Sequence, residues 1–301
     1  MAEKIVVTGG AGFIGSHIVD TCLLRGYDVH IIDDLSGGKM ERVNKKAVFH
    51  RLDIRDLDAI RPIIKGAKYV FHTAALPRVQ FSIENPILTN DVNVNGTINV
   101  LAASHEGGVE KVIYSASSSA YGDQDVMPLV ETMPTDPKSP YGLHKLVGEL
   151  YCRVWSTVYG LPTVSLRYFN VYGPRLDPDG AYALVIGKFL KQRKDNEPLT
   201  ITGDGTQTRD FTHVSDVVEA NMRAAESDVS DGNVFNIGFG KRIDINTLAQ
   251  LIGGESVHIA SRLEPHDTEA DNTKAKKYLG WSPKVTLEDG ITALKEEWGL
   301  D

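Results

Sequence analysis

Short apolar runs alternate with longer amphipathic stretches through the first half of the chain. The runs cover residues 4–9, 28–33, 68–75 and 111–116, and helical patterns lie between them. Strands that alternate with helices form βαβ units, because two parallel strands need a long crossover connection. The alternation therefore predicts an α/β fold with a doubly wound parallel sheet whose two faces are covered by helices.

The second half of the chain has a different pattern of predicted elements. A helical pattern runs over residues 141–160, after a Ser-Pro pair that is typical of a helix start, and a strand-like stretch follows it. Beyond residue 172 the elements become shorter and richer in proline and glycine. We expect one domain over residues 1–171, with return segments around 210–240, and a smaller, interleaved C-terminal α/β domain mainly over 172–301.

Composition excludes several classes of function. The 301 residues carry 32 Lys plus Arg against 40 Asp plus Glu, a formal charge of -8 that argues against general affinity for nucleic acid or anionic membranes. The N-terminus lacks the apolar segment of a signal peptide, and no run approaches the roughly 18 apolar residues of a membrane span. We expect a cytoplasmic protein. The two cysteines have no metal-ligand spacing, so neither a disulfide framework nor a metal site is expected.

A glycine-rich turn follows the first apolar run. In "VVTGGAGFIG", residues Gly10, Gly12 and Gly15 have G-x-G-x-x-G order at the start of a helical pattern. Such a turn lets backbone N–H groups approach a pyrophosphate, which then lies at the helix N-terminus. Asp33 ends the second run, where a carboxylate accepts hydrogen bonds from the adenosine ribose and repels a 2′-phosphate. The segment "DLSGGKM" has no arginine, so the pattern predicts NAD rather than NADP.

Tyr141 and Lys145 have Y-x-x-x-K spacing and therefore lie on one face of the predicted helix. A tyrosine with a pKa of about 10 needs about 4 kcal/mol of preference for its phenolate to titrate near pH 7. A neighbouring ammonium group and the positive nicotinamide ring favour the phenolate. The pair is thus a candidate general base that is poised at neutral pH.

Hydroxyl groups gather upstream of this helix in "YSASSSAYG", residues 114–122. With the glycine turn and the Tyr-Lys pair, and with "SPYGLHK", "LRYFNVYGPR" and "GDGTQTRDFTHVSDV", the chain resembles the extended short-chain dehydrogenase/reductase superfamily. Within it the sequence is most similar to the UDP-glucose (UDP-galactose) 4-epimerase family. The resemblance implies a Rossmann-type fold and a catalytic triad of Ser117, Tyr141 and Lys145.

The resemblance also implies binding residues and partners. The expected cofactor contacts are Gly9, Gly12, Phe13, Ile14, Gly15, Asp33, Asp34, Asp53, Ile54, Ala74, Ala75, Asn93, Tyr141 and Lys145. The expected contacts of a UDP-sugar substrate are Ser117, Asn170, Arg209, Arg262 and Thr268. A homodimer is expected as well, with the segments around 90–105 and 141–158 as the candidate interface.

The serine cluster separates the reactions of this superfamily. Sugar-nucleotide dehydratases have Thr-Asp-Glu where this chain has Ser117-Ser118-Ser119, and related decarboxylases usually have a glutamate at Ser119. The resemblance thus implies that Tyr141 deprotonates the sugar 4-hydroxyl while C4 delivers a hydride to NAD, and that the 4-keto sugar turns over and takes the hydride back.

Alternatives stay open at this point. The substrate is either the plain UDP-hexose, which we place first, or the N-acetylated hexose, since family members with a small residue at the position aligned with Thr268 admit an acetamido group. UDP-glucuronate epimerisation, another dehydratase or decarboxylase reaction, and a non-catalytic NAD sensor are less favoured.

Overall fold

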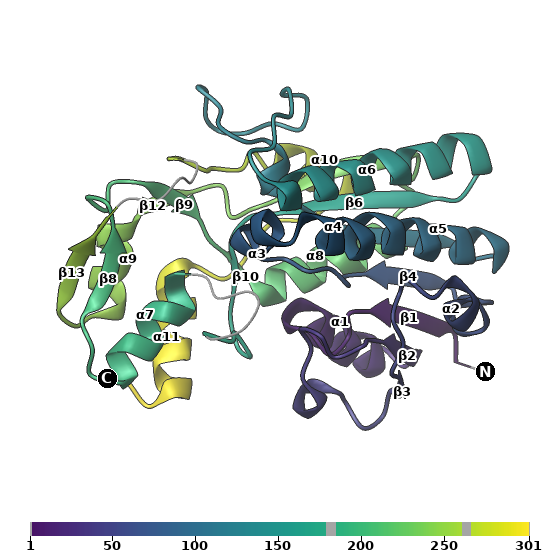
Figure 1. The fold of residues 1–301 in the computed structure, drawn as a ribbon, viewed down its shortest axis with the longest axis horizontal. Coiled ribbons are helices and arrows are strands. Elements are labelled where there is room, and N and C mark those ends of the chain that lie inside the picture. Colours follow the sequence, from purple (N-terminus) through teal and green to yellow (C-terminus); the bar gives the residue numbers. More distant parts are fainter. Residues whose placement is uncertain (1, 179–184, 261–265, 301) are drawn as a thin grey trace.

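A computed structural model describes residues 2–178, 185–260 and 266–300 (Figure 1). Seven parallel strands form its main sheet, in the order β11-β6-β5-β4-β1-β2-β3. Four of them lie within the predicted runs, namely β1 (Lys4–Thr8), β2 (Asp28–Ile32), β4 (Tyr69–His72) and, extended by one residue, β5 (Lys111–Ser117). The predicted doubly wound α/β class is confirmed.

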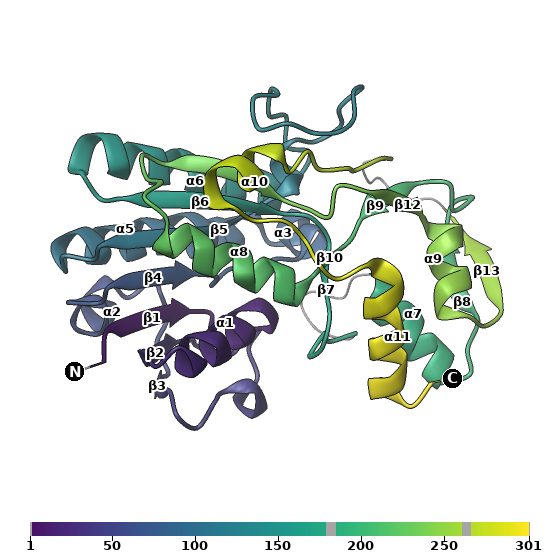
Figure 2. The ribbon, with the colours of Figure 1, turned by 180° about the vertical axis from the view of Figure 1, so that it is seen from behind.

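Helices cover both faces of the sheet, as the opposite views of Figures 1 and 2 show. One face carries α1 (Phe13–Leu24), α8 (Val214–Glu226) and α10 (Thr273–Leu279). The other face carries α2 (Leu57–Ile64), α3 (Val79–Glu84), α4 (Pro86–Asn90), α5 (Gly96–Glu106) and α6 (Pro140–Tyr159). Because both faces are covered, the central strands are buried throughout, as in the all-buried β5.

The strand order reverses beside β1. From β1 the chain builds outward through β2 and β3 (Val48–His50) on one side, and through β4, β5 and β6 (Thr163–Tyr168) on the other. In open α/β sheets a ligand crevice forms at such a reversal, outside the carboxyl ends of the strands. The fold thus places a crevice above the turns that follow β1, β2, β4 and β5.

Helix α6 begins as the sequence predicts. Pro140 is its first residue, and the Ser139 hydroxyl accepts a hydrogen bond from the Gly142 N–H at 3.1 Å. The helix ends at Gly160, whose φ of 73° is a left-handed conformation that glycine adopts without a steric penalty. Both ends of the helix that carries the Tyr-Lys pair are therefore fixed by local chemistry.

A smaller lobe lies at the end of the molecule that carries the C-terminus (Figure 1). It contains the parallel pair β8 (Leu199–Thr202) and β13 (Ser256–Ile259), and the antiparallel pair β9 (Thr208–Asp210) and β12 (Arg242–Asp244). Around these strands pack α7 (Val185–Lys194), α9 (Ile245–Ile252) and α11 (Leu287–Trp298). Between β9 and β12 in the sequence, the chain returns to the main sheet through α8 and the edge strand β11 (Asn233–Ile237).

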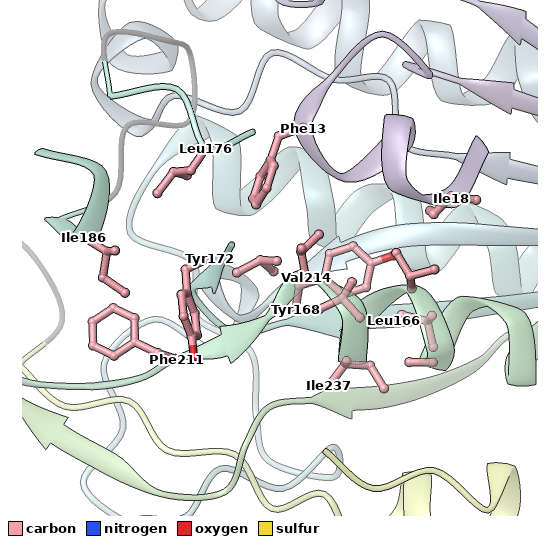
Figure 3. Packing of buried hydrophobic residues seen from close by; sticks show 14 of the residues in the cluster. Phe13, Ile18, Leu166, Tyr168, Tyr172, Leu176, Ile186, Phe211, Val214 and Ile237 are labelled. Carbon is pink, nitrogen blue, oxygen red and sulfur yellow. The ribbon is translucent and has the colours of Figure 1, made fainter. Parts of the chain in front are cut away.

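The two lobes share one apolar core. Figure 3 shows Phe13 beside the residues that follow β6, and Tyr172 between Phe211 and the main sheet. Tyr172 belongs to the short parallel pair β7 (Val171–Tyr172) and β10 (Thr212–His213), which crosses from one lobe to the other. In the part of the chain that the structure describes, no helix combines the length and apolar character needed to span a membrane.

Candidate active site

The glycine turn between β1 and α1 brings the backbone close to β4. Gly9 has a φ of 71°, and a Cβ atom there would lie 2.6 Å from the Ala74 nitrogen. A Cβ atom on Gly15 would lie 2.2 Å from the Gly9 carbonyl oxygen. Gly12 is the N-cap of α1. A side chain at Gly9 or Gly15 would therefore collide with the backbone of the turn or of the loop after β4, so glycine lets the turn pack closely at the N-terminus of α1.

Gly10, the first glycine of the sequence pattern, does not line the cleft, whereas Gly9, an expected cofactor contact, does. A Cβ atom at Gly10 would lie 2.8 Å from the Ile31 side chain, on the core side of the turn. The glycine that faces the cleft is Gly9, so the operative spacing is G-x-x-G-x-x-G over Gly9, Gly12 and Gly15. The pattern could not distinguish the two neighbours, because their directions depend on contacts with β2 and β4.

Beyond the turn a cleft that is open to solvent follows the carboxyl ends of the central strands. Most of the expected cofactor residues line it, namely Gly9, Gly12, Phe13, Ile14, Gly15, Asp33, Asp34, Asp53, Ile54, Ala74, Ala75, Tyr141 and Lys145. Asn93 does not line it. Its side chain accepts from the Leu76 N–H at 2.7 Å and donates to the Leu76 carbonyl at 3.1 Å, so it fixes the loop after β4 from behind.

Asp33 is held rigidly at the end of β2. Its carboxylate accepts hydrogen bonds from the N–H groups of Ala11 at 2.9 Å and Leu35 at 2.8 Å. Burial raises the pKa of this carboxyl, and the two backbone hydrogen bonds oppose the shift. Arg42 also lines the cleft, and the sequence pattern does not indicate it because it lies two residues beyond the "DLSGGKM" segment.

The three predicted catalytic side chains come together at one end of this cleft. Ser117 ends β5, and Tyr141 and Lys145 project from the first turns of α6; all three are at most 8% exposed. Lys145 Nζ donates to the Ser115 carbonyl at 2.7 Å and lies 5.1 Å from the centre of the Tyr114 ring. A hydrogen bond from the Ser117 hydroxyl favours the ionised form of Tyr141 and so lowers its pKa.

Burial dominates the pKa of Tyr141 among the described residues. Burial raises it to about 12, and the hydrogen bond with Ser117 opposes that shift only in part. Burial also lowers the pKa of Lys145 to about 8, so its ammonium group is still mostly protonated at pH 7. Among the described residues, the effect of burial on the tyrosine pKa therefore outweighs that of the groups that favour the phenolate.

The predicted substrate residues converge from distant segments. Asn170, with a φ of 29°, donates from Nδ2 to the Asp210 carbonyl at 2.8 Å and lies 3.5 Å from Thr268 Oγ1. Arg209 Nη1 donates to the carbonyls of Thr208 at 2.9 Å and His266 at 3.0 Å. Arg262, the remaining predicted contact, lies outside the described residues.

Asp210 holds this substrate end together and was missed by the sequence reasoning. The residue is fully buried, and its carboxylate accepts from the N–H groups of Phe239, Gly240 and Ala270 at 2.8–2.9 Å. Burial raises its pKa to about 6, against these three backbone hydrogen bonds. A carboxylate beside Arg209 in "TRDF" looks like an ion-pair partner, and nothing local indicates that it binds two distant loops.

A glycine-rich turn at a helix N-terminus, with an acid at the end of the next strand, fits the phosphates and ribose of a dinucleotide. The buried Tyr-Lys pair beside Ser117 adds the machinery of the short-chain dehydrogenase/reductase class. Residues 5–238 match the NAD dependent epimerase/dehydratase family. The chain belongs to this family, whose cofactor is NAD.

Solved structures of this class are similar over almost the whole chain. A UDP-glucose 4-epimerase from Thermotoga maritima, solved with UDP-glucose, is 41% identical with a TM-score of 0.94, covering 98% of each chain. A UDP-N-acetylglucosamine 4-epimerase from Methanobrevibacter ruminantium, in complex with UDP-N-acetylmuramic acid, is 36% identical with a TM-score of 0.92, over 99% of this chain and 100% of the other. A UDP-glucuronic acid 4-epimerase from Bacillus cereus, in complex with UDP-glucuronic acid and NAD, is 34% identical with a TM-score of 0.89, over 98% and 99%.

Proposed function

We propose that this protein is an NAD-dependent 4-epimerase that interconverts UDP-glucose and UDP-galactose through a 4-keto intermediate. The observation that carries the proposal is the placement of Ser117, Tyr141 and Lys145 at the end of a dinucleotide cleft, beside a serine cluster without a carboxylate. The similarity to 4-epimerases over nearly the whole chain supports the same reaction.

Each residue of the triad has a distinct task. The Tyr141 phenol, once ionised, accepts the proton of the sugar 4-hydroxyl and later returns it. Ser117 bridges the sugar hydroxyl and the phenol by hydrogen bonds, and Lys145 supplies positive charge and binds the nicotinamide ribose. Bound NAD supplies an acceptor for the C4 hydride and the donor that returns it to the opposite face.

The serine cluster limits the steps that are open to the oxidised sugar. Ser118 and Ser119 form a 3-10 turn at the end of β5, and Ser117 Oγ lies 3.1 Å from Ser119 Oγ and accepts from the Ser119 N–H at 3.2 Å. Hydroxyls that are bonded to one another offer no strong acid or base for removing water across C5 and C6. The return of the hydride is then the remaining route for the 4-keto sugar.

A UDP-N-acetylhexose is a second candidate substrate, favoured by one observation. Thr268 lies beside Asn170 at the substrate end, and its side chain is small. In the family, a small residue at the aligned position leaves room for an acetamido group. Asn170, Arg209 and Thr268 are accordingly the residues that we propose as contacts of the UDP-sugar, together with Ser117.

We also propose a homodimer. Large apolar side chains are exposed along α6 at Leu143, Leu150, Val154 and Val158, and along α3 and α4 at Ile83 and Ile87. In the predicted partner segment 90–105, the described residues expose no large apolar side chain. The face that we propose therefore combines α6 with residues 79–88, which precede the segment around 90–105 that the sequence suggests.

One assay tests the proposed reaction. The purified protein is incubated separately with UDP-galactose, UDP-N-acetylgalactosamine and UDP-glucuronate, with and without added NAD, and the products are followed by NMR. We expect UDP-glucose from UDP-galactose without net consumption of NAD. A 4-keto-6-deoxy sugar or a decarboxylated product would contradict the proposal, and conversion of the N-acetylated sugar alone would select the second candidate.

A further inference from the structure

A buried ion pair lies behind the catalytic residues and has no part in the proposed reaction steps. Glu149 follows Lys145 by four residues on α6, and its two carboxylate oxygens accept from Arg167 Nε at 2.8 Å and Nη2 at 2.7 Å. The two side chains are only 3% and 4% exposed. Desolvation makes such a pair a weak source of stability, so its position calls for another explanation.

The pair is anchored to the rest of the site on its far side. The Arg167 guanidinium lies 4.5 Å from the centre of the Tyr121 ring, and the Tyr121 hydroxyl donates to Asn236 Oδ1 at 2.7 Å. Arg167 Nη1 is buried without a hydrogen-bond partner among the described residues. Glu149 is therefore directed toward β6, while Lys145 Nζ is directed toward the Ser115 carbonyl.

The surroundings of Lys145 contain little compensating charge. Among the described residues, the titratable and charged groups that act on Lys145 or on Glu149 are His72 on β4, Tyr114 on β5, Arg167 on β6, and Tyr141, His144, Glu149, Cys152 and Arg153 on α6. Burial lowers the pKa of His72 to about 3 and raises that of Cys152 to about 12, so both are neutral at pH 7. Within this set Glu149 is the anion that opposes the effect of burial on Lys145.

We propose that Glu149 is a positioning residue that keeps the catalytic Lys145 protonated at neutral pH, while Arg167 holds the carboxylate away from direct contact with the ammonium group. A direct pair would draw Lys145 away from the Ser115 carbonyl and the cleft. The Glu149 carboxylate, one helical turn away and bound to Arg167, favours the protonated form of Lys145 without forming a direct contact that would move the lysine side chain. The inference rests on the proposed 4-epimerase function for its kinetic readout only.

The test follows Lys145 itself in the NAD-bound protein. Lysine labelled with ¹³C at Cε is titrated by NMR, and the Lys145 signal is assigned by its absence from Lys145→Met. In Glu149→Gln the Lys145 pKa should fall by about one unit, the lower end of the roughly 1–3 units by which a neighbouring opposite charge shifts a pKa. The fall of kcat at high pH should move down by the same amount. Glu149→Asp, which keeps the charge, should leave both midpoints near those of the unaltered protein.

A second variant keeps the test informative if Glu149→Gln misfolds. Glu149→Gln leaves Arg167 buried without its anion, so Glu149→Gln/Arg167→Met removes both charges, and its Lys145 pKa should also fall. An unchanged Lys145 titration in both variants overturns the inference, as does an equal loss of kcat at every pH in Glu149→Gln and Glu149→Asp. Failure of the unaltered protein to epimerise any UDP-hexose refutes the proposed function instead, and the NMR titration still decides the role of Glu149.

Discussion

The cofactor cleft and the substrate end of this site are built in different ways. The cleft depends on one short turn, whose glycines let the backbone of β1 and α1 approach β4. The substrate end depends on side chains that tie together Asn170, Asp210 and Ala270, which are far apart in the chain. The turn is formed by residues close together in the sequence and leaves no room for added side chains. The substrate end is formed by residues that are distant in the sequence, and it depends on individual polar groups.

The largest expected effect separates chemistry from cofactor binding. Because the glycine turn and Asp33 do not depend on the Tyr141 hydroxyl, Tyr141→Phe should retain bound NAD while turnover falls by about 10²–10⁴, the usual contribution of a positioned general base. Tyr168→Phe is the matched control, since Tyr168 also lines the cleft but bonds to Ser115 and Asn221. Turnover and NAD content are measured for both. Equal turnover in the two variants would remove Tyr141 from its role.

The next effect tests whether the turn tolerates a single methyl group. In Gly15→Ala the new Cβ atom would meet the Gly9 carbonyl at 2.2 Å, so the turn must open. We expect loss of NAD on purification and a free energy of unfolding lower by about 1–3 kcal/mol. Gly26→Ala is the control: Gly26 has a φ of 83° but no atom near its Cβ position, so about 1–2 kcal/mol of strain should leave NAD bound. NAD loss from both variants would show that general destabilisation is the cause.

The difference between the two regions also explains what the sequence could predict. The β1 turn and the start of α6 depend on residues within a few positions of one another, so spacing was enough to predict them. Asp33 accepts from the Ala11 N–H, 22 residues away, and it was predicted from the regular length of the βαβ unit. The sequence pattern begins at Gly10 although Gly9 lines the cleft, because the directions of these two glycines depend on Ala74 and Ile31. The three-residue strand β3 carries too short a pattern to be recognised. The role of Asp210 depends on N–H donors at residues 239, 240 and 270, which no local pattern connects.

A smaller effect is expected at the substrate end. Asp210→Asn replaces one acceptor oxygen by an amide donor, which then faces a backbone N–H. Leaving a buried donor unsatisfied costs about 1–3 kcal/mol. We expect a lower free energy of unfolding in urea and a higher KM for the UDP-sugar, with NAD content unchanged. The control is Asp244→Asn on the neighbouring β12, where Asp244 caps α9 by accepting from the Thr247 N–H at 2.8 Å and asparagine serves as well.

An unchanged KM in Asp210→Asn, or an equal rise in Asp244→Asn, would contradict the view that one carboxylate organises the substrate end. Loss of NAD from Asp210→Asn would contradict it in another way, because the two regions would then not be separable. We expect substitutions in the cofactor cleft to affect NAD binding and those at the substrate end to affect KM for the UDP-sugar, each without the other.

The smallest expected effect concerns the dependence of stability on pH, to which His72 and Asp210 contribute with opposite sign. His72, in the cofactor region, bonds to Thr8 at 2.7 Å and Thr97 at 2.9 Å, and burial lowers its pKa from 6.5 to about 3. Between these values the unfolded chain binds more protons, so His72 makes the protein less stable as the pH falls from 6.5. Burial raises the pKa of Asp210 from 3.8 to about 6, so Asp210 makes it less stable as the pH rises through that range.

The two contributions therefore oppose each other between pH 4 and 6, with limits of about 1.4 kcal/mol per pH unit each. Urea unfolding at half-unit steps of pH measures the slope. His72→Gln removes the term that rises with pH, so its slope should become more negative than that of the unaltered protein. Asp210→Asn removes the opposite term, so its slope should become more positive. Slopes that change in the same direction in both variants would mean that burial does not set these two pKa values, since burial acts on an imidazole and a carboxyl group with opposite sign.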